Sequence, residues 1–397
     1  MTMKTSRKKT KPIPDDRTLP QTSPAAELIA NNIDLLTQIL LRIPTKSIIR
    51  FKSVSKHWLS LLSDSGFASS HCRLNPKPLI SSLYFYFYYG GKLESVSLNG
   101  SPTTPSLSFL HPLTGDFKVQ HSCNGLLLIN YYKKFVDNRI EAQYLVCNPT
   151  TQKFRLLDYH VNEQYRSGFS SLSCWLAFDP SKSPHYKVVM FTSLYYCDPH
   201  WEVDIYSSET AWWKKIFLAN EETSGIYSKG AFWNGAIYRL FYHQYNLWRF
   251  DIETEEIIGI SCKGSSRILS LDKTRYLGEC GRGGRLLLIQ SPSHSALRFK
   301  IRKMDDDGCR WNVKFRVDLE TLISEFPEME SKKRMRFTIM CAVEGENENE
   351  FSLILAIPGK MISYNLQKKT WKVLRDNSEN VPRNVGVFPF VESLSPV

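Results

Sequence analysis

The stretch VCNPTTQKF (residues 146–154) decides the fold, because its pattern returns four more times along the chain. In each copy a turn-forming residue ends one β-rich run, five residues follow, and an aromatic or apolar residue opens the next run. Successive copies lie between 44 (251 − 207) and 60 (365 − 305) residues apart. The turn-forming residues of the five copies are Asn148, Ser207, Asp251, Asp305 and Asn365.

A second pair of β-rich runs lies between these turns. Residues 122–129 and 231–238 each place Asn-Gly between β-formers, the sequence preferred by two-residue hairpins. Residues 176–190 and 336–355 read as longer hairpins. Each period therefore contains about four strands, and repeated four-stranded units are typical of a β-propeller.

Five periods are visible, and a sixth blade could combine strands near residues 83–98 with residues 387–391. This pairing would close the ring between distant parts of the chain. We therefore expect six blades, with seven as the alternative count. A β-sandwich is the alternative fold, but it would not produce this regular double-hairpin period.

Residues 35–62 have a different pattern, which predicts three short helices. Asn31 is the expected N-cap of the first, and Pro44 is expected to stop it. The second and third are expected over residues 46–51 and about 55–63. A unit this small cannot bury its apolar residues by itself, so they must pack on the rest of the chain or dock on another protein.

The order of these residues resembles the F-box family over residues 28–67, although Leu28-Ile-Ala-Asn-Asn32 replaces the Leu-Pro with which the family usually opens. The resemblance implies a trihelical module that docks on the Skp-type adaptor of a cullin–RING ubiquitin ligase. The residues expected to contact the adaptor, or to shape the face that does, are Leu35, Leu36, Ile39, Leu40, Ile43, Pro44, Ile48, Phe51, Val54 and Trp58.

The rest of the chain resembles the F-box-associated domain of plant F-box proteins, through residues 122–127, 146–151, 176–189 and 205–210. That domain is a kelch-like propeller, and the family holds a substrate protein for ubiquitin transfer. The expected architecture is an α+β multidomain protein. It consists of a disordered basic tail (residues 1–26), a small N-terminal trihelical F-box (28–67) and an all-β propeller (77–397). The substrate and the loops that bind it are not predicted.

Composition excludes several other classes. The chain of 397 residues is 42% hydrophobic, which is enough for a large core, and it has no run of the ~20 apolar residues that a membrane helix needs. The nine cysteines are scattered without a C-x-x-C pair, so reduced thiols are expected rather than disulfides. The pair Cys197 and His200 lacks a second ligand pair, and we expect no metal and no cofactor. The protein is expected in the nucleus, the cytoplasm or both.

The net charge of +12 permits a second interpretation, a nucleic-acid-binding propeller. Trp212 and Trp213 beside Lys214 and Lys215 would suit such a role. Against it, Trp213 occupies the aromatic position of the repeat, and the tail alone carries 6 − 2 = +4 of the charge. No G-x-S-x-G, P-loop or H-E-x-x-H motif is present, so a non-catalytic adaptor is preferred to an enzyme.

Overall fold

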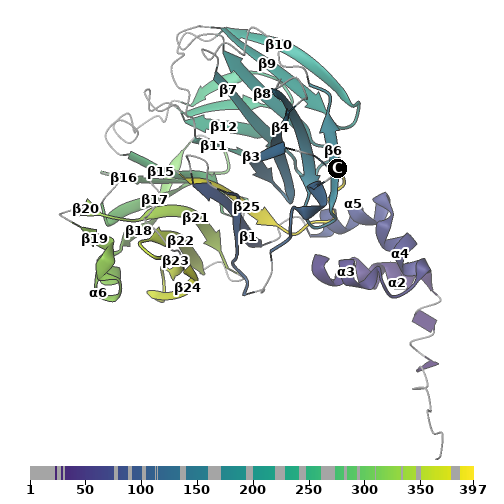
Figure 1. Cartoon of the computed structure of the whole chain (residues 1–397), viewed down its shortest axis with the longest axis horizontal. Helices are drawn as coiled ribbons and strands as arrows, with labels where there is room; N and C mark the ends of the chain where they lie inside the picture. The colour runs from purple at the N-terminus through teal and green to yellow at the C-terminus, as the bar shows by residue number, and fades with distance from the viewer. Residues whose placement is uncertain are drawn as a thin grey trace, which may run out of the picture. The chain divides into compact units, whose positions relative to one another are not determined.

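Six sheets of three or four strands make up most of the protein, seen here in a computed structural model (Figure 1). The structure describes residues 23–24, 28–29, 32–75, 79–87, 92–100, 104–111, 113, 115–134, 140–159, 171–193, 200–219, 229–240, 247–260, 273–280, 284–292, 296–308, 310–331, 334–345, 350–376 and 385–397. The chain divides into two compact units, residues 1–43 and 44–397, and each is described by itself. Most of the predicted basic tail (residues 1–26) lies outside the described residues.

Five sheets each contain four antiparallel strands that follow one another in the chain. The first two are β3 (Gly115–Cys123), β4 (Leu126–Lys134), β5 (Ile140–Asn148) and β6 (Lys153–Leu157), then β7 (Ser171–Ala177), β8 (Lys187–Ser193), β9 (His200–Ser207) and β10 (Trp212–Ala219). The next two are β11 (Lys229–Trp233), β12 (Ala236–Leu240), β13 (Leu247–Asp251) and β14 (Ile257–Ile260), then β15 (Lys273–Glu279), β16 (Leu286–Ser291), β17 (Arg298–Met304) and β18 (Trp311–Asp318). The fifth contains β21 (Thr338–Glu344), β22 (Phe351–Ile357), β23 (Lys360–Asn365) and β24 (Thr370–Asp376).

The sixth sheet joins distant parts of the chain. Its strands have the order β2 (Glu94–Ser97), β1 (Ile80–Phe87) and β25 (Val385–Val391). Strands β1 and β25 pair antiparallel, with Phe85 opposite Val387. The innermost strands of the six sheets contact one another in a closed cycle, β3, β7, β11, β15, β21, β25 and back to β3. The prediction of six blades, closed by residues 387–391, is confirmed.

The repeated turn lies between the third and fourth strands of each four-stranded blade. Asn148 Oδ1 accepts from the Thr150 N–H at 2.9 Å, and the equivalent Asn365 Oδ1 accepts from the Lys368 N–H at 2.8 Å. Four residues after the turn-forming residue, the backbone is left-handed, as at Gln152 (φ 57°) and Lys369 (φ 53°). A side chain that accepts from the backbone favours this turn, which explains the repeat of Asn and Asp.

The two Asn-Gly turns join the first and second strands of their blades. Asn124 and Gly125 have φ values of 45° and 87°, and Asn234 and Gly235 have 45° and 80°. Two positive φ values in succession are the mark of the type I′ hairpin that the sequence predicted.

These two glycines permit a matched stability test. An added Cβ at Gly125 would lie 2.4 Å from Ser393 Cβ, whereas one at Gly235 would meet only Lys182 Nζ at 4.0 Å. Gly235→Ala should cost about 1 kcal/mol from backbone strain, and Gly125→Ala about 2–3 kcal/mol because it also displaces residue 393. Chemical denaturation of both variants measures the difference. Equal destabilisation would show that Ser393 does not pack on this turn.

The unit of residues 1–43 contains one helix of the predicted module, α2 (Ile33–Leu40). Its N-cap is Asn32, whose Oδ1 accepts from the Leu35 N–H at 3.0 Å, so the prediction of Asn31 as N-cap is wrong by one residue. Asp34 still lies in the first turn, where the helix dipole favours an acidic side chain.

Three further helices open the unit of residues 44–397. They are α3 (Thr45–Phe51), α4 (Lys56–Ser63) and α5 (Ser65–Leu74). The first two confirm the predicted second and third helices, and Pro44 is the N-cap of α3. Helix α5 was not predicted. Asp64 caps it by accepting from the Phe67 N–H at 2.9 Å, and its residues Phe67, His71 and Cys72 are buried.

A second unpredicted segment lies between β18 and β21. It contains α6 (Glu320–Glu325), the 3-10 helix η3 (Pro327–Met329) and the short strands β19 (Glu330–Ser331) and β20 (Arg334–Met335). Leu322 and Met329 are buried against the core of the adjoining blades. A further 3-10 helix, η1 (Ser108–Leu110), precedes β3.

Candidate functional site

Helix α2 has two apolar sides. Leu36 and Leu40, one turn apart, are 3% and 1% exposed, and Leu41 after the helix is also buried. Leu35 and Ile39, also one turn apart, are 45% and 41% exposed. Residues at i and i+4 lie on one face of a helix, so Leu35 and Ile39 form a small apolar surface in contact with solvent. Exposed apolar side chains in such an arrangement are available to a partner protein.

Helices α3 and α4 also leave apolar side chains exposed. Val54, in the turn between them, is 58% exposed, and Leu59 is 49% exposed. Phe51 and Trp58 are half-buried and contact each other edge to face, with ring centroids 5.5 Å apart. Ile48 is fully buried, so it belongs to the core of this helical segment.

The ten predicted adaptor-contacting residues therefore fall into two groups. Leu36, Leu40 and Ile48 are buried. The exposed or half-buried residues are Leu35, Ile39, Ile43, Pro44, Phe51, Val54 and Trp58.

Residues 392–395 connect α3 and α5 to the propeller. Lys46 Nζ forms an ion pair with Glu392 Oε1 at 3.0 Å, and Cys72 Sγ lies 3.5 Å from Ser393 Oγ. On the propeller side, Asn148 Nδ2 donates to the carbonyl oxygens of Ser393 at 3.0 Å and Ser395 at 2.8 Å. One short segment thus contacts both the helices and the first four-stranded blade. We call residues 392–395 the linking segment.

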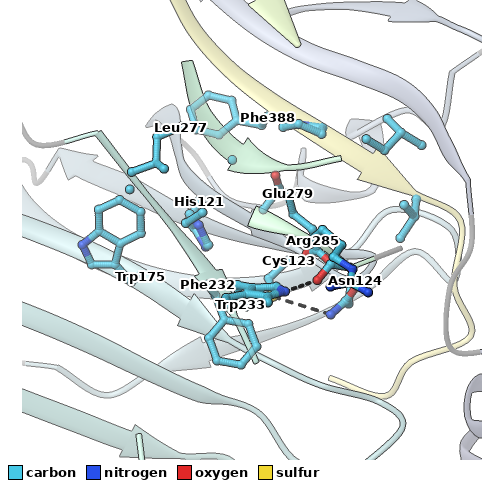
Figure 2. Close-up of a pocket in the computed structure, with 18 of the residues that line it drawn as sticks. His121, Cys123, Asn124, Trp175, Phe232, Trp233, Leu277, Glu279, Arg285 and Phe388 are labelled. Carbon is cyan, nitrogen blue, oxygen red and sulfur yellow. Dashed lines mark hydrogen bonds between the residues drawn. The ribbon is translucent and has the colours of Figure 1, made fainter. Parts of the chain in front are cut away.

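The ring surrounds a cavity of about 590 Å³ that is partly open to solvent. Its lining runs from the inner strands to the turns that follow them, and Figure 2 shows the side chains that gather there. Its aromatic lining residues include Trp175, Phe232, Trp233, Tyr276 and Phe388. We call this space the central channel, and its size suits a side chain or a short peptide segment.

Hydrogen bonds hold the rim of the central channel in place. Trp233 Nε1 donates to the Gly284 carbonyl, and Asn124 Nδ2 donates to the Phe178 carbonyl at 2.7 Å. Trp175 fits because Gly230 has no side chain, since a Cβ there would lie 2.6 Å from the indole. The channel is therefore preformed by its own side chains.

In the described part of the lining, four residues are charged: Asp179, Glu279, Asp306 and Arg285. Arg285 forms an ion pair with Asp306. His121 Nδ1 accepts from the Leu176 N–H at 3.1 Å, and burial lowers the pKa of His121 to about 4. The imidazole is therefore neutral at physiological pH, with its proton on Nε2.

The one cysteine among the described lining residues, Cys123, is not an activated nucleophile. Burial, together with the negative charges of Glu279 and Asp179, raises the pKa of its thiol well above the ordinary value. A thiol with a raised pKa is a poor nucleophile. No group of three His, Cys, Asp or Glu suited to a metal ion occurs among the residues that the structure describes, and Cys197 lies outside them.

The lysines beside Trp212 are engaged in ion pairs. Lys214 Nζ lies 2.5 Å from Glu255 Oε2, and Lys215 Nζ lies 2.8 Å from Glu202 Oε2. Trp213 packs against Tyr159 and Tyr206, so it is part of the blade. Lys214, Lys215 and Trp213 thus make contacts within or between blades, whereas Trp212 is 74% exposed.

Comparison with known families identifies both parts of the chain. Residues 92–397 match the F-box associated beta propeller domain, and residues 32–69 match the F-box domain. The chain belongs to the F-box proteins with an associated propeller. The predicted limits of 28–67 and 77–397 for the two domains stay predictions. In the described part of this F-box protein, no helix has the length and apolar character to cross a membrane.

Two curated relatives of this F-box protein come from Arabidopsis thaliana. The chain is 29% identical to the F-box protein At5g07610, with 94% of each chain covered. It is 24% identical to the putative F-box protein At4g17780, with 92% of this chain and 86% of the relative covered. Both similarities span the F-box and the propeller together.

Sequence reasoning did not find the central channel. Its lining residues are scattered from Ile80 to Val391 and become neighbours only when the ring closes. One signal was available, because Asn124 and Asn234 of the two Asn-Gly turns both lie at its rim. The turn motif predicted the hairpins but not their convergence.

Proposed function

We propose that this protein is the substrate-recognition subunit of a Skp–cullin–F-box ubiquitin ligase. The observation that carries the proposal is the combination of an F-box match over residues 32–69 with a propeller match over residues 92–397 in one chain. The F-box would bind a Skp-type adaptor, and the propeller would bind a substrate protein. That role would place the protein in the nucleus or the cytoplasm.

The exposed apolar residues support an adaptor-binding role for the F-box. Leu35 and Ile39 on α2, with Pro44 and Val54 further along, are the residues best placed to lose solvent in a complex. Ile43, Phe51 and Trp58 are partly available. Leu36, Leu40 and Ile48 would act indirectly, by fixing the helices on which the exposed residues lie.

No chemical step is assigned to this protein. A receptor that holds a substrate beside a ligase raises the effective concentration of one reactant near the other, and this suffices for transfer by the partner enzyme. The raised thiol pKa of Cys123 supports the same view, since it leaves the channel without an activated thiol.

The test is complex formation with purified proteins. The full chain is mixed with a plant Skp-type adaptor and passed over a size-exclusion column. We expect one peak that contains both proteins in equal amounts. Separate elution at micromolar concentrations would contradict the proposal.

A further inference from the structure

We propose that the central channel binds a basic side chain, lysine or arginine, presented by a segment of the substrate protein. The inference rests on the proposed function, because it names the chemistry of the substrate segment. It is drawn from the volume, charge and polar groups of the channel, which belong entirely to the unit of residues 44–397.

Charge is the first argument. Among the residues that the structure describes, the charged side chains lining the channel are three carboxylates and one guanidinium, which gives 1 − 3 = −2. The whole protein carries +12, so the channel has the opposite sign to the molecule around it. Such a local reversal would draw a cationic group inward and repel an acidic one.

One of the three carboxylates, Asp306, is paired with Arg285, and its side chain is 80% exposed at the rim. The other two act on the same part of the channel. Asp179 and Glu279 come from different blades, yet both act on the thiol of Cys123 and raise its pKa. The Asp179 carboxylate accepts from the Ser181 N–H at 3.0 Å, so a neutral donor holds it in place while its charge remains.

Aromatic rings suit the stem of a basic side chain. Trp233, Phe232 and Phe388 line the same channel as the carboxylates (Figure 2). Lysine and arginine bury their methylene stems against apolar surfaces while the charged end reaches polar groups, and their cations are attracted to aromatic faces. An aromatic wall beside carboxylates therefore fits both halves of such a side chain.

His121 indicates a peptide rather than a free amine. Its Nδ1 accepts from the Leu176 N–H, so its Nε2 carries the proton. His121 lines the channel and packs edge to face against Trp175, with ring centroids 5.0 Å apart. A donor at this place can bind a backbone carbonyl of the segment that delivers the basic side chain.

The test uses the full chain and immobilised peptide pools. Each pool has a fixed central residue (arginine, lysine, citrulline or glutamate) between three randomised residues on either side, with blocked ends. Citrulline has nearly the shape of arginine but no charge. We expect the wild-type chain to bind the arginine and lysine pools about tenfold more tightly than the citrulline pool. Equal binding of the arginine and citrulline pools would overturn the proposal. This comparison needs only the wild-type chain.

Variants locate the preference in the channel. Glu279→Gln combined with Asp179→Asn should remove most of the preference for the basic pools. Glu209→Gln combined with Glu253→Gln, two exposed carboxylates in turns outside the channel lining, is the matched control and should keep it. An unchanged preference in the first double variant would overturn the proposal. So would displacement of the peptides by spermidine at the concentration at which they bind, because the site would then take small cations.

The result is separable from the proposed function. The channel variants should still form a complex with the Skp-type adaptor, because no channel residue lies in the matched F-box. Failure of the wild-type chain to bind the adaptor would contradict the proposed function and leave the peptide result standing. Failure of the peptide preference with normal adaptor binding would overturn only the inference about the channel.

Discussion

Replacing Leu35 and Ile39 together with aspartate is expected to abolish binding of a Skp-type adaptor and leave the fold intact. Both side chains are more than 40% exposed, so the change costs the free protein little. In a complex, each would lose about 1 kcal/mol of apolar burial, since less than half of each side chain is still exposed, and each carboxylate would also have to be desolvated without a partner. Together these effects predict a loss of more than about 100-fold in affinity, measurable by calorimetry.

The matched control is Leu74→Asp with Leu156→Asp. These leucines are 56% and 47% exposed, and both lie outside the matched F-box. The control introduces the same two charges in place of exposed aliphatic side chains and should bind the adaptor normally. Leu36 is unsuitable for this test, because it is 3% exposed and aspartate there would unfold the helix. Normal binding by the Leu35 and Ile39 variant would place the adaptor elsewhere on the chain.

The second large effect is expected at Asn148, which is fully buried in the first four-stranded blade. Its amide donates to Ser393 and Ser395, and its Oδ1 accepts from Thr150 and Thr151. Asn148→Ala removes all four hydrogen bonds and leaves buried backbone groups without partners. At about 1 kcal/mol for each bond, the free energy of unfolding should fall by about 3–4 kcal/mol, a large share of the stability of a typical domain.

Asn365→Ala is the control for Asn148→Ala. Asn365 occupies the same turn position in another blade, and its Oδ1 accepts from the Gln367 and Lys368 N–H groups. We expect a loss of about 1–2 kcal/mol there, because only the turn is affected. Hydrogen exchange of the backbone amides at 393–395 should rise in the Asn148 variant alone. Equal stability losses in the two variants would mean that the linking segment contributes nothing through Asn148.

The blades were predictable because their signals are local. An Asn, Asp or Ser followed by five residues and an apolar residue fixes a turn, as at Asn148 and Asn365, through the hydrogen bonds of the turn itself. The closing strand was predictable for a different reason. Residues 387–391 had strand character but no neighbouring strand in the sequence, and only the ring offered a partner.

What was missed depends on tertiary contacts. Helix α5 has a weak apolar pattern, and its buried Cys72 makes sense only beside Ser393, which is more than 300 residues away in sequence (393 − 72 = 321). The error at Asn31 has a local cause, since two successive asparagines are equally good caps and only the structure shows which one bonds to Leu35. The exposed and buried sides of α2 could not be separated either, because leucine and isoleucine occupy both.

The pairing of β1 with β25 also has a consequence for protein synthesis. The F-box emerges from the ribosome before the propeller, but β1 and β2 must wait for their inner strand until the chain has been made as far as Val391. During that time Leu83 and Phe85, which are fully buried in the finished protein, lack the neighbour that completes their sheet. A chain interrupted before β25 would, on the proposed function, carry an adaptor-binding F-box without a closed ring. It would compete with the finished protein for the ligase and deliver no substrate to it.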